Sequence, residues 1–401
     1  MKKIANNRGI TLIALIVTII VLLILAGISV SMLTGQNGIL NRAAEAKEKT
    51  VVAQKDEEKT LQGYEDIMAQ YTGSLPLREE TKPYFPNSTF SYKEGNLSTG
   101  LVIKDSNDNE YVWVEVPKTI YDNTTYNNNG ANKPKNADEW EKIRDCLKAY
   151  TVDYSDSSYK DTNTDGTTYS DDYKNMLKSV YTNGGFWIGR YEAGYEIDES
   201  KGETVRYYGT DYNTEHPITQ KVVIKKNAYP YNWVRRDQAQ TLAEGINYTG
   251  VTSSLIYGVQ WDLVLKFIET KGATTKEDLT SNSKAIGNCK DNLWNITNVN
   301  VKYSTNNGNT FNVCPYQKNA SEGVLLTTGA DTSFSLMNIY DIAGNVWEWT
   351  REFCNTSYPC VYRSGSCYDD GSYNPAKDRG YSTTSHSNLH LGFRLGLWKQ
   401  Q

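Results

Sequence analysis

One stretch near the C-terminus combines a thiol with carboxylates and phenols. It reads VYRSGSCYDDGSYNPAKDRGY and places Cys367 just before Asp369 and Asp370, in a frame of Gly, Ser, Pro and Arg. A cysteine thiolate can act as a nucleophile or, with a second thiolate, hold a soft metal ion. The chemistry of this stretch therefore depends on which groups accompany Cys367.

The other cysteines and the histidines supply few partners for that thiol. The chain has six cysteines, none of them after Cys367, and three histidines. Cys354 and Cys360 bracket NTSYP and are candidates for a disulfide, which would persist outside the cell. Six cysteines allow about 15 pairings, so the connectivity stays open. His386 and His390 share one loop and lie near no Ser–Asp pair, so they indicate neither a zinc site nor a catalytic triad.

The strongest local motif is NIYDIAGNVWEWTRE, at residues 338–352. It separates the carboxylates of Asp341 and Glu348 by a Gly-Asn turn, where Gly344 allows an unusual backbone angle or a close approach. Two hard oxygen ligands together with turn carbonyls suit calcium. A buried tryptophan cluster with solvated acids is the alternative interpretation.

Three short motifs together resemble one family. YDIAGNVWEW, YRSGS and LGFRL are similar to the series found in the formylglycine-generating enzyme (sulfatase-modifying factor) family. The resemblance covers about residues 85–398 and is strongest over 338–394. It implies an α+β class, C-type-lectin-like domain with long irregular insertions.

The resemblance makes different predictions for two metals. One calcium site of the family maps onto the side chains of Asp341 and Glu348 and the carbonyls of Gly344 and Val346, so a structural calcium ion is expected. Active members hold copper between two cysteine thiolates that lie shortly after a Gly-Gly-Ser. Here Cys367 follows that serine directly and no second cysteine lies beyond it. Because copper(I) requires soft thiolates, we expect no copper and no oxidase activity.

The residues around Cys367 have the composition of a recognition surface. Tyrosine gives rigid amphipathic area, and Ser, Asn and Asp give adaptable hydrogen bonds, as in antibody loops. The pattern also resembles the variable proteins of diversity-generating retroelements, in which adenine-directed mutagenesis rewrites Asn codons; a solvated polar loop would give a similar composition. The predicted ligand-binding residues are Tyr368, Asp369, Asp370, Tyr373, Asn374, Tyr381, His386, Asn388 and His390.

A second Asp-rich stretch, DTNTDGTTYSDD, matches part of a calcium-loop pattern. Asp161, Asn163, Asp165, Gly166 and Asp172 have the required spacing. The final position is Asp where the motif has a bidentate Glu, and no convincing helix precedes the stretch. An Asx-rich surface loop is therefore the preferred interpretation.

The N-terminus predicts a membrane anchor. MKKIANNRG is basic, and the chain then runs without a charge from Ile10 to Leu33, longer than the roughly 20 residues that a spanning helix needs. Basic residues before the span and a long domain after it place the N-terminus in the cytoplasm and the rest outside. The segment resembles type IV prepilins and pseudopilins, which implies cleavage between Gly9 and Ile10. Ala14 stands where that family usually has Glu, which favours an anchor over a major fibre subunit.

The remaining chain divides by composition. Residues 41–71 are rich in strong helix formers, and the prolines that follow end the helix. Within the C-terminal domain, helices are expected at 136–150, 175–181, 229–246 and 253–269. The predicted organisation is a leader at 1–9, a transmembrane helix at 10–33, a helical stalk at 34–72, a linker at 73–84 and the lectin-like domain at 85–401.

These patterns lead to one hypothesis and two alternatives. The net charge of −5, with mixed signs, gives no nucleic-acid footprint. We expect a single-pass cell-membrane protein with its C-terminal domain extracellular, binding a protein or glycan ligand through a catalytically inactive domain. One alternative is an active oxidase that acts on cysteine-containing peptides. The other is a minor pilin or pseudopilin whose partners are pilus subunits.

Overall fold

The computed structural model describes residues 16–25, 47, 49–50, 63, 72–76, 78–205 and 220–400. The chain divides into two compact units, Met1–Ile67 and Met68–Gln401. In the first unit, residues 16–25 form a helix whose apolar side chains are exposed, and the other described residues are also helical. No helix within the described residues is long and apolar enough to cross a membrane. The predicted cleavage site at Gly9 and Ile10, and most of the predicted span and stalk, lie outside the described residues.

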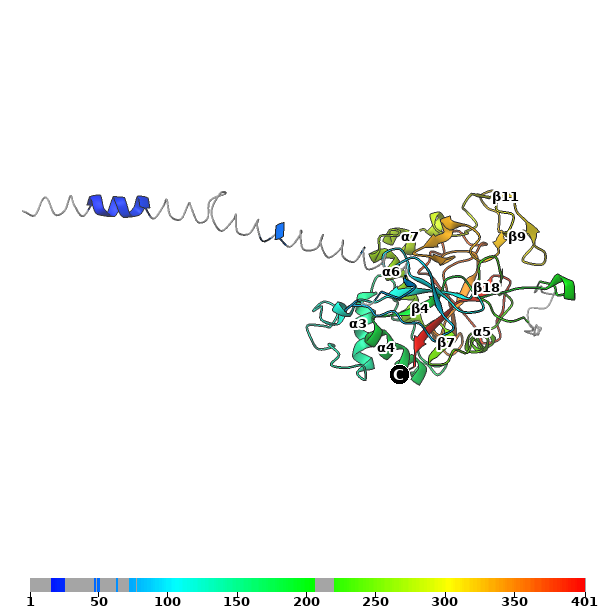
Figure 1. Ribbon diagram of the computed structural model, residues 1–401, viewed down its shortest axis with the longest axis horizontal. Helices are drawn as coiled ribbons and strands as arrows, with labels where there is room; N and C mark the ends of the chain where they lie inside the picture. Colours follow the sequence, from blue (N-terminus) through cyan, green and yellow to red (C-terminus); the bar gives the residue numbers. More distant parts are fainter. Residues whose placement is uncertain are drawn as a thin grey trace, which may run out of the picture. The chain divides into compact units, whose positions relative to one another are not determined.

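The second unit is a mixed α+β structure built on a six-stranded antiparallel sheet (Figure 1). The C-terminal strand β19 lies between β4 and the edge strand β7, so the end of the chain is an interior strand of the sheet. In order across the sheet, the strands are β1 (Ser91–Glu94), β2 (Val102–Lys104), β3 (Glu110–Glu115), β4 (Gly185–Gly189), β19 (Leu395–Lys399) and β7 (Val251–Leu255).

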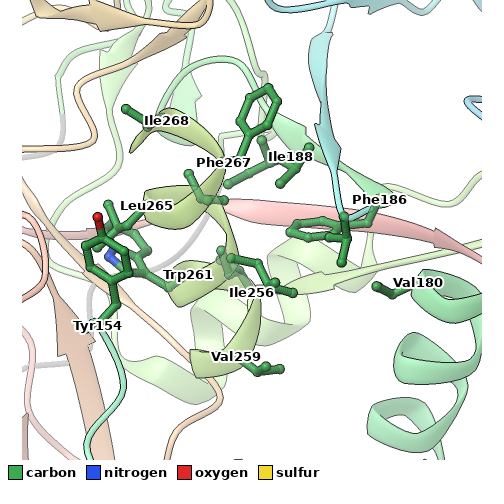
Figure 2. Close-up of a cluster of buried hydrophobic side chains, with 14 of the residues drawn as sticks. Tyr154, Val180, Phe186, Ile188, Ile256, Val259, Trp261, Leu265, Phe267 and Ile268 are labelled. Atoms are coloured by element: carbon green, nitrogen blue, oxygen red, sulfur yellow. The ribbon is translucent and has the colours of Figure 1, made fainter. Parts of the chain in front are cut away.

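Both faces of this sheet are buried. In β4, Phe186 and Ile188 belong to one hydrophobic core, and Trp187 between them belongs to the other. Successive side chains of a strand point to opposite faces. The run GFWIG is therefore apolar throughout, because each face of β4 packs against its own hydrophobic core. Figure 2 shows Leu265 and Phe267 in the same cluster as Phe186 and Ile188.

Local signals in the sequence match several helices of the second unit. α4 begins after Ser170, whose hydroxyl accepts the Tyr173 N–H at 3.1 Å, and ends at Gly184 with φ of 67°. α6 is buried over most of its length, which matches its nearly continuous apolar sequence. The helices are α3 (Trp140–Tyr150), α4 (Asp171–Asn183), α5 (Arg236–Glu244), α6 (Gly258–Thr270) and α7 (Lys276–Thr280).

A four-stranded sheet, in the order β17-β16-β15-β18, carries the C-terminal motifs. β15 pairs parallel with β18 and antiparallel with β16. Its strands are β15 (Trp347–Trp349), β16 (Cys360–Arg363), β17 (Arg379–Ser382) and β18 (Leu391–Phe393). The smaller sheets are formed by β5 (Gly194–Tyr195) with β6 (Tyr229–Pro230), β8 (Trp294–Ile296) with β11 (Tyr316–Lys318), β9 (Lys302–Ser304) with β10 (Asn312–Val313) and β12 (Leu325–Leu326), and β13 (Ser335–Leu336) with β14 (Ile339–Tyr340).

Two of the predicted helices are shorter than their sequence pattern. The helix expected at 229–246 is formed only over α5, because residues 229–230 pair as β6 with β5. The helix expected at 253–269 begins at Gly258, because residues 251–255 pair with β19 as strand β7. In both segments, pairing with a distant strand overrides the helical periodicity.

The predicted linker at 73–84 is partly integrated into the second unit. Thr81 is fully buried; its hydroxyl donates to the Gly184 carbonyl at 2.9 Å and accepts the Trp113 indole N–H at 2.7 Å. The Trp187 indole N–H donates to the Tyr84 carbonyl at 2.9 Å. The compact unit therefore begins well before residue 85.

A buried ion pair connects the two larger sheets. The Arg394 guanidinium and the Glu348 carboxylate both have no exposed side-chain surface, and the Nη2–Oε1 distance is 2.7 Å. Arg394 Nη1 also donates to the Gly189 carbonyl at 2.9 Å, and Nη2 to the Tyr340 carbonyl at 2.8 Å. One side chain therefore joins β15, β4 and β14 to the segment between β18 and β19.

We predict that Arg394→Met will destabilise the protein by about 3–5 kcal/mol, because it leaves the Glu348 carboxylate buried without a cation. Urea unfolding of the full chain, followed by tryptophan fluorescence, measures the change. Lys104→Gln is the control, since it removes only an exposed i,i+4 pair with Asp108 and should leave the unfolding free energy nearly unchanged. Equal effects of the two substitutions would contradict the central role of the Arg394 pair.

Candidate functional site

The four-stranded sheet presents a row of aromatic rings. Trp347 and Trp349 lie on the face of β15 opposite to Glu348, because successive side chains alternate. The Tyr362 ring of β16 contacts both edge to face, with centroid distances of 5.0 Å to Trp347 and 5.3 Å to Trp349. Gly380 lies opposite Tyr362 in β17, and a Cβ there would meet the ring at 1.9 Å. Only glycine therefore lets Tyr362 lie across β17.

The two predicted histidines extend this row at its ends. The His386 ring lies 6.5 Å from the Trp349 ring, and the His390 ring lies 5.7 Å from the Tyr368 ring. The Tyr368 hydroxyl donates to Asn307 Oδ1 at 2.9 Å. We call this set the aromatic ridge; its members are Trp347, Trp349, Tyr362, Tyr368, His386 and His390.

Asp369 holds the ridge in place. Its Oδ2 accepts the Trp347 indole N–H at 2.8 Å, the Ser366 N–H at 3.0 Å and the Ser366 hydroxyl at 2.6 Å. Because this oxygen already accepts three hydrogen bonds from the protein, we expect it to contribute little to binding a ligand. Asp369 therefore orients Trp347 and fixes the turn after β16.

The other predicted contact residues divide into three places. Asp370, Tyr373 and Asn374 belong to one turn, in which Asn374 donates to Asp378 at 2.6 Å and Tyr373 is 82% exposed. Tyr381 lies in β17, with its ring 5.6 Å from that of Tyr358. The carbonyl of Asn388 accepts the N–H groups of Trp233 and Leu391, so Asn388 supports the loop through its backbone.

Trp347, Tyr362 and Tyr358 were absent from the predicted contact set. Their signal was available, since WEW and CVYR read as alternating strands that place aromatic residues on one face. The pairing of these strands, Trp349 opposite Tyr362, could not be read from the sequence.

Burial lowers the pKa of both ridge histidines below its ordinary value near 6.5. For His390, the nearby Asp369 carboxylate partly opposes this decrease in pKa, and His386 lowers the pKa further. His390 Nδ1 is buried and has no hydrogen-bond partner among the described residues. Both imidazoles are therefore neutral at pH 7 and act as flat, polar-edged rings.

We predict that acid destabilises the protein through these histidines. Their unfolded pKa is higher than their folded pKa, so the unfolded state binds protons first and stability is lost as the pH falls below about 6.5. The contribution of these histidines to the melting temperature of the purified full chain should therefore fall between pH 7 and pH 5, against the opposite effect of buried carboxyl groups such as Glu192, whose pKa is raised. His386→Gln combined with His390→Gln should reduce this fall, whereas Tyr373→Phe should leave it unchanged. An identical pH dependence in the double variant and the original chain would refute the prediction.

The thiols of this region are not arranged for chemistry. Cys367 is fully buried, and burial raises the pKa of its thiol well above the ordinary value, with Asp369 and Glu192 adding to the effect. All six cysteines are free in the structure, and the Cys354–Cys360 disulfide stays a prediction. Cys360 is held in β16 opposite Ser382 with its side chain in the core, whereas Cys354 is half-buried beside Asn355.

We predict that iodoacetamide at pH 8 will label Cys354 in the native full chain at least about tenfold faster than Cys367, because the buried thiol reacts only after local opening. Mass spectrometry of tryptic peptides measures both rates. In urea the two rates should converge, which controls for intrinsic reactivity. Protection of both Cys354 and Cys360 until a reductant is added would instead establish the disulfide.

The residues predicted to bind calcium already have protein partners. Glu348 accepts from Arg394 through both oxygens, and Asp341 Oδ2 accepts the Gly329 N–H at 2.8 Å. An ion at Asp341, Gly344, Val346 and Glu348 would have to share these carboxylates. In the described part of the chain, no group of three or more His, Cys, Asp or Glu side chains could hold a metal ion. Calcium binding stays a prediction.

The prediction that position 344 requires glycine, for an unusual backbone angle or a close approach, is confirmed. Its φ is 75°, and a Cβ would meet the Asn288 carbonyl oxygen at 2.4 Å. Glu192 was not predicted from the sequence; its Oε1 accepts the Val346 N–H at 3.1 Å and its Oε2 accepts the Asn345 amide at 2.7 Å. Burial, with Asp341 and Glu348 nearby, raises the pKa of Glu192 well above its ordinary value.

No protein-family model and no curated protein matches the chain. Similar solved structures include Treponema denticola variable protein 1, at 14% identity and a TM-score of 0.30, covering 54% of this chain and 85% of that one. Others are the crystal structure of CarF, at 14% and 0.28 over 54% and 87%, and PvdO from Pseudomonas aeruginosa, at 13% and 0.28 over 54% and 81%. Similarities at this level support no inference about ligand or activity.

Proposed function

We propose that this chain is a surface-displayed binding protein whose second unit recognises an extracellular protein or glycan. The unit would be a catalytically inactive C-type-lectin-like domain of the formylglycine-generating type, as the motifs in residues 338–394 suggest. The observation that carries the proposal is the aromatic ridge. It gathers Trp, Tyr and His rings from β15, β16 and the loops after β16 and β17 onto one side of a sheet.

The chemistry of the ridge suits recognition. Tyr362, Tyr368, His386 and His390 are half-buried, so each has one packed edge and one accessible edge. Aromatic side chains of this kind supply much of the binding energy in protein interfaces, because they bury large area at low entropic cost. Tyr381, 47% exposed beside Tyr358, extends the accessible aromatic area along β17.

The state of Cys367 favours binding over oxidation. Copper chemistry in the resembled family needs two thiolates, and this chain has no cysteine after Cys367. Burial of that thiol favours its protonated form, which is neither a nucleophile nor a metal ligand.

Anchoring at the cell membrane is part of the same proposal. The apolar side chains of residues 16–25 are about half to two-thirds exposed, and such a surface is stable only against lipid or a protein partner. Together with the basic N-terminus, this supports the proposal that the second unit lies outside the cell. Diversification of its C-terminal region would be supported by a near-copy of the gene's 3′ end that differs mainly at adenines, beside a reverse transcriptase gene.

We predict that the ligand contacts the ridge. Purified full chain would be screened against arrays of glycans and extracellular proteins, and each hit measured by surface plasmon resonance. Tyr362→Ala and Tyr368→Ala should each weaken a true ligand by at least about tenfold, as expected for loss of an aromatic anchor. The measured quantity is the dissociation constant.

The control is Val299→Ala, which truncates an exposed apolar side chain outside the ridge and should leave the affinity unchanged. Circular dichroism confirms that the ridge variants are folded. Copper-dependent oxidation of a cysteine-containing peptide by the purified chain would replace the binding proposal with the oxidase alternative.

A further inference from the structure

A cavity of about 370 Å³ lies where α3, the loop at residues 155–161 and the N-terminus of α6 meet. Its size is at the lower end of the range of about 300–1,000 Å³ that is typical of small-molecule sites. It is lined by charges of both signs and by the rings of Tyr159 and Tyr169. None of its lining residues belongs to the aromatic ridge, so its chemistry is separate from that site.

One wall of this cavity contains a carboxylate that no cation neutralises. Asp161 is 5% exposed, and its oxygens accept the N–H groups of Gly258 at 2.6 Å and Val259 at 3.0 Å. Among the described residues, no Lys, Arg or His nitrogen lies within 4.0 Å of it. Burial and the nearby Glu352 carboxylate raise the pKa of Asp161 to about 6. A cation placed beside Asp161 would therefore be strongly favoured.

The neighbouring acids on this wall are already neutralised. Asp262 accepts from Arg363 Nη2 at 2.8 Å and Arg379 Nη2 at 3.1 Å. Glu352 accepts from Arg379 Nε at 2.8 Å and Arg363 Nη1 at 3.3 Å. These two carboxylates and two guanidinium groups balance one another, so neither guanidinium neutralises Asp161.

The lining also contains a lysine whose charge acts on Asp161 and lowers its pKa slightly, without a direct ion pair between the two groups. Lys148 of α3 is half-buried and lines the cavity, and it makes no ion pair or side-chain hydrogen bond with a described residue. Arg144, one turn earlier, is occupied: its guanidinium donates to Asp145 at 2.8 Å and lies 5.3 Å from the Tyr169 ring centroid. Without a direct ion pair, the attraction between two partly buried charges offsets only part of the cost of removing each from water.

We propose that this cavity binds a zwitterionic α-amino acid, whose ammonium group pairs with Asp161 and whose carboxylate pairs with Lys148. Such a ligand supplies both missing charges at once. Tyr159 and Tyr169 provide flat walls for its side chain. The site is independent of the aromatic ridge, so either proposal can fail without the other.

Asp161 also has a structural role that the test must separate from binding. It caps the N-terminus of α6 from a distant loop, and the backbone pairing of Lys160 with Phe353 holds that loop in place. Asp161→Asn would therefore weaken both the helix and the site. Lys148 has no such structural contact, so a change there affects the cavity alone.

Isothermal titration calorimetry of the full chain with the free L-amino acids tests the proposal. The tightest binder would then be compared with its N-acetyl derivative, which lacks the ammonium charge, and its amide, which lacks the carboxylate. Each derivative should bind at least about tenfold more weakly. Lys148→Gln should weaken the free amino acid by a similar factor and leave the melting temperature unchanged.

Lys142→Gln is the matched control, because Lys142 lies on the same helix, pairs with Glu139 and does not line the cavity. It should leave the affinity for the amino acid unchanged. The proposal is overturned if no amino acid binds at millimolar concentration. It would also be overturned if either derivative bound as tightly as the free amino acid, or if the Lys142 and Lys148 substitutions had equal effects.

Discussion

The buried pair between Glu348 and Arg394 is the interaction on which the arrangement of the second unit depends. A guanidinium has five N–H donors and cannot be deprotonated in a protein, so burying it requires acceptors on every side. The structure supplies the Glu348 carboxylate and the carbonyls of Gly189 and Tyr340. These acceptors come from strands far apart in the chain, so Arg394 brings the two larger sheets into one relative position.

The aromatic ridge follows from that position. Once Glu348 faces Arg394, alternation along β15 directs Trp347 and Trp349 to the other face of the sheet, where Tyr362 meets them. The side chains of β16 alternate in the same way: Tyr362 belongs to the ridge, whereas the adjacent Arg363 forms ion pairs with Asp262 and Glu352 on the other face. Buried ion pairs on one side of the four-stranded sheet thus support, on the other, two buried tryptophans with the half-buried rings of Tyr362, Tyr368, His386 and His390 around them.

Local patterns predicted several elements well. The helices α3 and α4 and the unusual backbone angle of Gly344 follow from residues adjacent in sequence. The same patterns failed where a distant partner decided the outcome. Residues 253–255 have helical spacing but form part of a strand, because β19 offers them backbone hydrogen bonds. Trp347 and Trp349 were expected to pack around Asp341 and Glu348, yet pleating of β15 separates them from the Glu348 carboxylate.

By itself, the sequence determined the α+β composition, the apolar N-terminal run, the absence of a second thiol after Cys367, and the aromatic and polar residue types near the C-terminus. Only the tertiary structure decided which of those side chains are accessible: Asp369 is committed to Trp347 and Ser366, whereas Tyr373 is open to solvent. The tertiary structure also placed Asp161 at the N-terminus of α6, although Asp161 and Gly258 are 97 residues apart in sequence. It placed Lys148 in the lining of the same cavity as Asp161. Residue type is a local property, but burial and charge balance are set by whichever groups the folded chain places alongside, and those partners lie far away in sequence.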